Sequence, residues 1–253
     1  MRDVRGMLWS LCPILAGKPY LVRLLRRSIR SKMQTDLNIL SYYMRILKKT
    51  LRCAFTYEWS SLLDVGCGDG LFLKILSSIY RAGFLVGLDI YFNPRWIKIK
   101  KHAALTVDFV VGDALHLPFR DEAFDIAFEK DALHHVEDPL KALKEMKRVV
   151  KCGGKTWIVE ANRYNPIMYI HMTLIRGHQH FSHNKFRELV GELFKRDVCI
   201  VSTESHVLPF LKNSVFALRI LYTLEDLLEN VRLFNMLLSY NIAVGKKPEC
   251  KDT

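Results

Sequence analysis

The stretch that most constrains this chain is Ser61–Leu71, where a short apolar run ends at Asp64 and three glycines follow at alternate positions. These are Gly66, Gly68 and Gly70, and an amphipathic helical pattern comes directly after them. A strand, a glycine turn and a helix together bring backbone N–H groups and a helix N-terminus against a ligand. Glycine is needed because a Cβ atom would block that approach or forbid the dihedral angles of the turn. The stretch therefore predicts a ligand-binding loop.

The spacing of the glycines and the position of the carboxylate narrow the choice of ligand. Dinucleotide-binding folds use Gly-x-Gly-x-x-Gly, whereas this loop reads Gly-x-Gly-x-Gly. Asp64 stands at the end of the strand, and a fixed carboxylate there suits a ligand that carries an ammonium group. Taken by itself, the loop leaves a dinucleotide-binding oxidoreductase open as an alternative.

After Ser61 the chain alternates apolar runs with helical patterns, which is typical of a mostly parallel sheet. Further strands are expected at 84–89, 107–111, 124–128, 155–160, 198–204 and 239–244. Helices are expected at 94–104, 139–150, 183–194 and 210–233. The glycines of Lys151-Cys-Gly-Gly should end the helix that precedes them. The polar connection 162–182 should form neither a strand nor a regular helix.

Carboxylates follow two of these strands, at the edge where α/β sheets of this kind bind ligands. Asp89 ends the second strand, 23 residues after Gly66, and can accept hydrogen bonds from both hydroxyls of a ribose. Asp113 follows the third strand, where it could accept a hydrogen bond from an adenine amino group. Both positions suit a ligand that contains a nucleoside.

In order and spacing, these motifs and the segment 129–139 resemble the type 11 subgroup of class I S-adenosylmethionine-dependent methyltransferases, over roughly residues 60–160. The resemblance implies an α/β fold with a Rossmann-like seven-stranded sheet and helices on both faces. It also implies S-adenosylmethionine as the cofactor. The implied cofactor-binding positions are Asp64, Gly66 and Gly68 for the methionine part, Asp89 for the ribose with Ile90 beside it, Asp113 and Ala114 for the adenine, and Glu129 near the methionine carboxyl end.

The segment after the fourth strand departs from the pattern of this family, because Glu129, Lys130 and Asp131 stand where relatives carry small or neutral residues. Methyl transfer is an in-line displacement that mainly requires alignment of the reacting atoms. A hydroxyl or enol acceptor would be helped by a base, and Asp131, His134 and His135 are the catalytic candidates. An amine or carbon acceptor would need little acid–base chemistry. For His135 the structural alternative is a cap or packing contact at the start of the next helix.

A second group of histidines, His178, His180 and His183, lies in the long polar connection and at its end. No Asp or Cys stands among them at a spacing that suits metal ligands. We therefore expect a polar lid at this position and no metal site.

The chain has 253 residues and a formal net charge of +12, and residues 1–60 hold twelve Lys/Arg against three acids. We expect a basic helical N-terminal extension over 1–58 and a methyltransferase domain over 59–253. Residues 59–160 form the cofactor half of that domain and 161–253 the acceptor-side half. In the extension, Tyr20–Ser31 has four leucine or isoleucine residues on one face and four arginines opposite. Such a helix suits an anionic membrane surface or RNA phosphates, and a merely solvated face is the structural alternative.

The six cysteines are scattered, without a Cys-x-x-Cys pair, which indicates neither a disulfide framework nor a zinc site. This favours a reducing, cytoplasmic setting with peripheral membrane contact as an option. The motifs of amine-directed DNA methyltransferases and RNA cytosine-C5 enzymes are missing after the fourth strand. A small-molecule or lipid-like acceptor is the favoured substrate. An RNA methyltransferase and a non-catalytic module that binds cofactor or nucleic acid are the alternatives.

Overall fold

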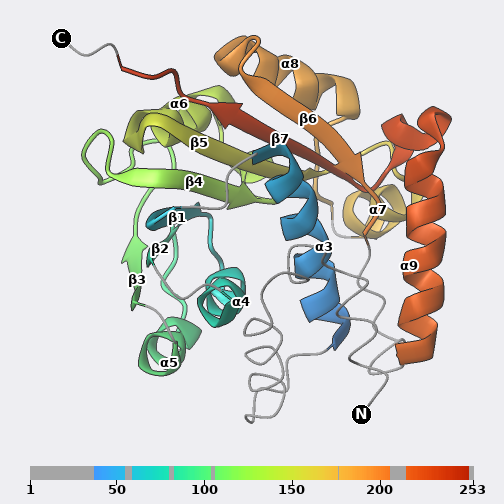
Figure 1. Cartoon of the computed structure of the whole chain (residues 1–253), viewed down its shortest axis with the longest axis horizontal. Coiled ribbons are helices and arrows are strands. Elements are labelled where there is room, and N and C mark those ends of the chain that lie inside the picture. The colour runs from blue at the N-terminus through green and yellow to red at the C-terminus, as the bar shows by residue number, and fades with distance from the viewer. Residues whose placement is uncertain are drawn as a thin grey trace.

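The computed structural model describes residues 37–54, 59–79, 83–103, 106–175, 177–205 and 215–250 (Figure 1). Within them one sheet holds seven strands: β1 (Ser61–Val65), β2 (Phe84–Asp89), β3 (Thr106–Val111), β4 (Phe124–Lys130), β5 (Val150–Ala161), β6 (Val198–Thr203) and β7 (Tyr240–Lys246). Their order is β3-β2-β1-β4-β5-β7-β6, and only β7 runs antiparallel to its neighbours in the described sheet. The prediction of a seven-stranded Rossmann-like sheet is confirmed.

Helices cover both faces of the sheet (Figure 1), which is why the central strands β1 and β4 are buried along most of their length. One face carries α3 (Leu37–Ala54), α4 (Leu71–Ile79) and α5 (Arg95–His102). The other carries α6 (Pro139–Val149) and α8 (His183–Phe194). Two buried clusters, one on each face, form the core. The chain changes direction across the sheet between β1 and β4, so a crevice is expected at their carboxyl ends.

The remaining elements lie beyond the carboxyl ends of the strands. They are the 3₁₀ turn η2 (Leu133–His135), the short helix α7 (Pro166–Met168), the π-helix η3 (Tyr169–Ile175), the helix α9 (Val215–Asn230) and the 3₁₀ segment η5 (Arg232–Leu237). The expectation of no regular helix between β5 and α8 was therefore wrong for 166–175. Asn165 caps α7 by accepting a hydrogen bond from the Met168 N–H at 3.0 Å, and Pro166 occupies the first helical position.

Local capping signals set the first residues of α8 and α6. Ser182 caps α8, and the predicted span 183–194 agrees with the structure. Asp138 and Pro139 begin α6 in the same way. However, α6 ends at Val149 and β5 begins at the next residue, so the expected glycine cap was wrong. Gly153 instead has a φ of 72° inside β5.

The cysteines correct another expectation. Cys53 on α3 is bonded to Cys199 on β6, and Cys152 is bonded to Cys250, with Cα–Cα distances of 5.6 and 5.4 Å. Cys67 is the free cysteine among the described residues. The expectation that the cysteines form no disulfides was therefore wrong for these two pairs. Among the residues that the structure describes, no helix combines the length and apolar character needed to span a membrane.

An ion-pair network joins α3 to α9 across the carboxyl edge of the sheet. Arg45 is 5% exposed, and its guanidinium contacts Glu229 at 2.8 Å, Asp226 at 2.9 Å and Glu225 at 3.6 Å. It also donates to the backbone oxygen of Glu204 at 2.7 Å. The charge of Arg45 is therefore buried between α3 and α9 and is not solvated. The extension over 1–36, including Tyr20–Ser31, lies outside the described residues.

Candidate active site

The glycine loop lies at the carboxyl end of β1, against the end of β2. The backbone N–H groups of Gly66 and Cys67 both donate to the Leu88 oxygen, at 2.7 and 3.0 Å. A Cβ at Gly66 would overlap that of Ala132, so glycine lets this loop approach the segment after β4. Gly68 has a φ of 53°, and the space beside it is open, because a Cβ added there would meet no other atom within 4 Å. The loop thus leaves room for a ligand at Gly68.

Asp89 lies at the end of β2, and its carboxylate is fixed against the glycine loop. One carboxylate oxygen accepts the Gly68 N–H at 2.8 Å, and the other accepts the Tyr91 N–H at 3.2 Å. Each carboxylate oxygen can accept a second hydrogen bond, so both remain able to receive a hydroxyl. The backbone oxygen of Asp89 also accepts the Gly112 N–H at 2.9 Å, which joins this strand end to the Asp113 loop.

Trp96 is a positioning residue that sequence reasoning missed. Its indole N–H donates to the Gly68 oxygen at 2.8 Å, and its ring stacks on Phe109 with centroids 4.9 Å apart. Arg95 forms an ion pair with Asp69 in the same loop. The available signal in the sequence was a tryptophan in an otherwise basic helix. The structure buries Trp96 together with Ile99.

The predicted adenine side presents both polar and apolar groups. Asp113 is exposed, and its carboxylate accepts the Leu115 N–H at 2.8 Å, which lowers the pKa of Asp113. Ile90 and Val111 are more than half exposed at the ends of β2 and β3. Ala114 lies next to Asp113 and packs against the core. An ionised acceptor flanked by apolar surface suits a purine with an amino group.

Asp64 is buried at the end of β1. Burial, together with the nearby Asp89 carboxylate, raises the pKa of Asp64 to about 8, although Lys130 opposes the shift. The free protein therefore holds this carboxyl largely protonated at neutral pH. An ammonium group placed beside it would favour the charged form.

Glu129 is fully buried, and its oxygens accept the Val159 N–H at 3.0 Å and the Ala132 N–H at 3.2 Å. Burial, together with Glu160, raises the pKa of Glu129. This geometry gives Glu129 a role in shaping the turn after β4. Direct contact with the methionine end of the cofactor stays a prediction.

In comparisons with known proteins, the segment that holds these residues is similar to methyltransferases. The family model described as "Methyltransferase domain" matches residues 63–158. The chain is 35% identical over 120 residues to the demethylmenaquinone methyltransferase of Bacillus cereus (strain B4264), which covers 46% of this chain and 51% of that protein. The chain therefore spans about half the length of the curated relatives that it matches. The family-model match, residues 63–158, contains every predicted cofactor-binding position.

Residues 63–158 form a class I S-adenosylmethionine-dependent methyltransferase domain.

Two solved structures extend the likeness of the methyltransferase fold beyond the matched region. One is a methyltransferase from a complex with the Haloferax volcanii activator Trm112, with a TM-score of 0.58, 22% identity, and coverage of 84% of this chain and 92% of that one. The other is an S-adenosylmethionine-dependent methyltransferase of Thermotoga maritima, with a TM-score of 0.56, 18% identity, and coverage of 90% and 99%. At these identities the likeness establishes the fold.

The cofactor of this methyltransferase domain is S-adenosylmethionine. The residues present fit it, because the open cradle at Gly68 adjoins the Asp89 carboxylate and the exposed apolar surface of Ile90. Asp64 would face the methionine ammonium group, Asp89 the ribose and Asp113 the adenine. Bound there, the cofactor supplies an activated methyl group.

The raised pKa of Asp64 predicts that cofactor binding releases a proton. S-adenosylhomocysteine carries the same ammonium group, so binding it should ionise Asp64, release close to one proton at pH 7 and release almost none well above pH 8. Affinity should accordingly weaken as the pH falls below about 8. Calorimetry in buffers of different ionisation enthalpy measures the proton count. Asp64→Asn should remove the release, and a wild-type proton count that is zero at pH 7 would contradict the assignment.

At the end of β4, Lys130 lies inside a box of tyrosines. Its Nζ is 5.1 Å from the ring centre of Tyr42, 5.8 Å from that of Tyr43 and 5.2 Å from that of Tyr240. Burial opposes the charge, but the ion pair with Asp131 outweighs it and raises the pKa of Lys130. Tyr42 and Tyr43 come from α3 and Tyr240 from β7, so sequence spacing gave no signal of this box.

Asp131 is held tightly within this arrangement. It has a φ of 53°, an uncommon conformation for a residue with a side chain. Its carboxylate accepts the Ala161 N–H at 3.1 Å and the Tyr240 hydroxyl at 3.3 Å, and pairs with Lys130. Burial opposes ionisation, but Lys130 lowers the pKa of Asp131, which makes it a weak base. Its catalytic role stays a prediction, and the geometry favours positioning.

The structure gathers histidines that the sequence had treated separately. His134 and His135 lie on η2 with ring centroids 4.0 Å apart, and His178 and His180 approach them from the connection after β5. The 3₁₀ turn allows the two adjacent rings to share one region. His183 lies apart, because its Nδ1 shares a hydrogen bond of 2.8 Å with the Asn241 side chain.

Proposed function

We propose that the whole chain transfers a methyl group from S-adenosylmethionine to a small, lipophilic acceptor. The observation that carries this proposal is the tyrosine box around Lys130, which adjoins the end of β4 in the methyltransferase domain. An aromatic enclosure with a buried cation suits a flat, electron-rich acceptor such as a phenol or quinol. The cofactor residues described above lie at the ends of the neighbouring strands β1 and β2.

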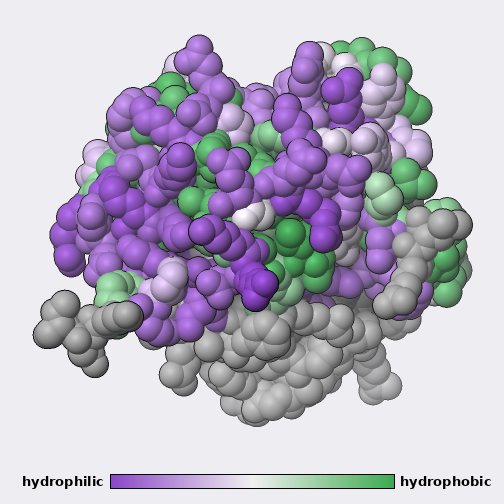
Figure 2. Space-filling model, turned by 90° about the horizontal axis from the view of Figure 1, so that it is seen from above, coloured by the Kyte–Doolittle hydropathy of each residue, from purple (hydrophilic) through white to green (hydrophobic). Residues whose placement is uncertain are grey.

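Exposed apolar surface near this end of the sheet supports a lipophilic acceptor. On η3, Ile170, Leu174 and Ile175 are exposed, Ile175 to 71%. On α9, one helical face is exposed: Phe216, Ile220, Leu224 and Leu227. Figure 2 shows hydrophobic surface on the right-hand flank, the side on which α9 lies in Figure 1. Contiguous apolar surface of this kind is typical of interaction sites for lipids or proteins.

The curated relatives, named demethylmenaquinone methyltransferases, support the same acceptor class. The family-model match, residues 63–158, lies within the cofactor half. We therefore propose a quinol-like or other lipophilic acceptor as a class, approached at a membrane surface. The basic helix expected over Tyr20–Ser31 would favour an anionic surface.

Acceptor chemistry on this proposal depends mainly on alignment. Lys130 and the tyrosines would hold an acceptor oxygen and its ring, and Asp131 would fix Lys130 in place. The histidines beyond Asp131 would assist the loss of the acceptor proton. Each of these roles concerns the acceptor. Substitution of these residues should therefore alter turnover more than cofactor affinity.

Partition of a labelled methyl group tests the acceptor class. The full chain is incubated with methyl-labelled S-adenosylmethionine and a total cell extract, which is then separated into organic-soluble lipid, RNA and protein. The proposal expects label in the lipid fraction, resistant to ribonuclease and absent with Asp89→Ala. Label that appears in the RNA fraction and disappears on ribonuclease treatment would overturn it in favour of an RNA methyltransferase.

A further inference from the structure

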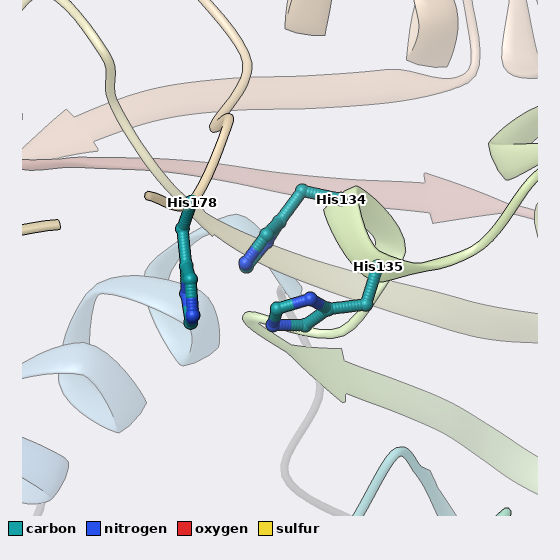
Figure 3. A group of neighbouring side chains, drawn as sticks. All are labelled: His134, His135 and His178. Atoms are coloured by element: carbon teal, nitrogen blue, oxygen red, sulfur yellow. The ribbon is translucent and has the colours of Figure 1, made fainter. Parts of the chain in front are cut away.

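The histidine group at the end of β4 has the arrangement of a metal-binding site. Figure 3 shows the rings of His134, His135 and His178 reaching toward one another from two segments of the chain. One nitrogen from each lies within 4.8 Å of the other two. His180 adds a fourth ring, with its centroid 4.0 Å from that of His134. Within the described residues, three to four imidazoles thus share one small region.

Several nitrogens in this group lack the partners that buried polar atoms normally have. Among the described residues, His134 Nε2, His178 Nδ1 and both ring nitrogens of His180 are buried without a hydrogen-bond partner. The side chain of His134 is 2% exposed, and His180 is also buried. Leaving such groups unpaired costs free energy, so each requires an explanation. A bound cation would satisfy several of them at once.

Glu160 orients His134 in the manner of a carboxylate behind a metal ligand. Its Oε2 and the His134 Nδ1 share a hydrogen bond of 2.8 Å, while its Oε1 accepts the Leu133 N–H at 2.8 Å. With Nδ1 occupied, Nε2 is the atom that His134 presents to the other rings. Metal-bound histidines commonly hold a carboxylate on their second nitrogen, which fixes the ring and its tautomer. The Glu160 side chain is fully buried, so this bond is shielded from water.

We propose that His134, His135 and His178 bind a divalent transition-metal ion of the zinc class, with Glu160 as the carboxylate that orients His134. Three imidazoles suit zinc and its neighbours in the transition series, whereas magnesium and calcium prefer oxygen ligands. Zinc–nitrogen bonds of about 2.0–2.1 Å place tetrahedral ligands about 3.4 Å apart. The nitrogens therefore need to close by at most about 1.4 Å.

Three histidines leave one coordination position open, as in catalytic rather than structural zinc sites. Asp131 and Glu160 lie close enough to balance the charge of the ion. The site itself rests on the histidine geometry, and it does not depend on the proposed acceptor. Its place after β4 puts the open position on the acceptor side of the methyltransferase domain.

Cobalt binding to the full chain tests the site without an activity assay. The protein is stripped with a chelator, kept in its disulfide-bonded form and titrated with Co²⁺, and the visible absorption of the ion is recorded. We expect one ion per chain with the intense bands of a four- or five-coordinate site, and displacement by Zn²⁺. His134→Gln and His178→Gln should each weaken binding at least tenfold, with an unchanged circular dichroism spectrum. Equal binding by wild type and these variants would overturn the proposal.

His183→Gln is the matched control, because His183 follows the same connection but bonds Asn241 instead of joining the cluster. It should retain full cobalt affinity. A second described group, Glu122, Cys152 and Cys250, could also hold a metal if its disulfide were reduced. Cobalt bands that survive in His134→Gln and vanish in Cys152→Ser would place the ion there and refute the histidine site. Failure of the wild type to retain any ion would refute it as well, whatever the turnover assay shows.

Discussion

Asp89→Ala should weaken S-adenosylhomocysteine binding by about 100-fold while the domain stays folded. A hydrogen bond to a charged group contributes about 1.5–3 kcal/mol, and Asp89 is placed to accept two from the ribose. Two such bonds at the lower end correspond to a loss of about two orders of magnitude in affinity. The substitution also removes the bond between Asp89 and the Gly68 N–H, which holds the glycine loop against β2. Calorimetric titration gives the change in Kd directly.

Asp108→Ala provides a matched control for that experiment. Asp108 is a carboxylate on the adjacent strand β3, and it pairs with Lys100 at the surface instead of facing the glycine loop. Its removal should leave the Kd within about twofold, since surface ion pairs contribute little. An unaltered Kd in Asp89→Ala would show that β2 does not carry the ribose site.

Arg45→Met should lower the free energy of unfolding by about 3–5 kcal/mol, the range for breaking a buried ion pair from one side. Arg45 is the cation shared by Glu225 and Glu229, whose side chains are 2% and 8% exposed. Methionine fills a similar volume but leaves those carboxylates without the guanidinium. The loss of stability should arise mainly from the weakened contact between α3 and α9. Urea unfolding followed by circular dichroism measures it.

Two further variants separate the charge from packing. Arg45→Met combined with Glu229→Gln removes one of the carboxylates that lost the guanidinium and should recover part of the lost stability. Lys49→Met removes a more exposed partner of the same Glu229 and should cost less than Arg45→Met. If Arg45→Met lowers the free energy of unfolding by less than about 1 kcal/mol, the network does not hold α3 in place. A contribution of that size is typical of ion pairs at the protein surface.

The sheet could be predicted because its signals are local. Apolar runs, the glycine loop and capping residues such as Ser182 each act within a few positions, and they gave the strands and α8 correctly. The same signals located Asp89 and Gly68, which the structure joins by a hydrogen bond. The exception was the end of α6, where β5 begins immediately and leaves no glycine cap.

The region around Lys130 and the histidines could not be predicted because it is assembled from distant segments. Helical spacing shows that Arg45 lies on the basic flank of α3, but not that three acids of α9 meet it. Tyr42, Tyr43 and Tyr240 enclose Lys130 only after α3 and β7 have packed on the same end of the sheet. The histidines were read in two groups for the same reason. The pairing of cysteines likewise cannot be deduced from spacing.

The most direct test of the account is turnover of S-adenosylmethionine to S-adenosylhomocysteine by the full chain, measured with and without a lipid extract of cells. The account predicts product formation that requires the extract, rises with its amount and is lost with Asp89→Ala. Tight cofactor binding by the wild type, with no product in the presence of lipid, RNA or protein extracts, would contradict it. That result would identify the chain as a non-catalytic cofactor-binding module.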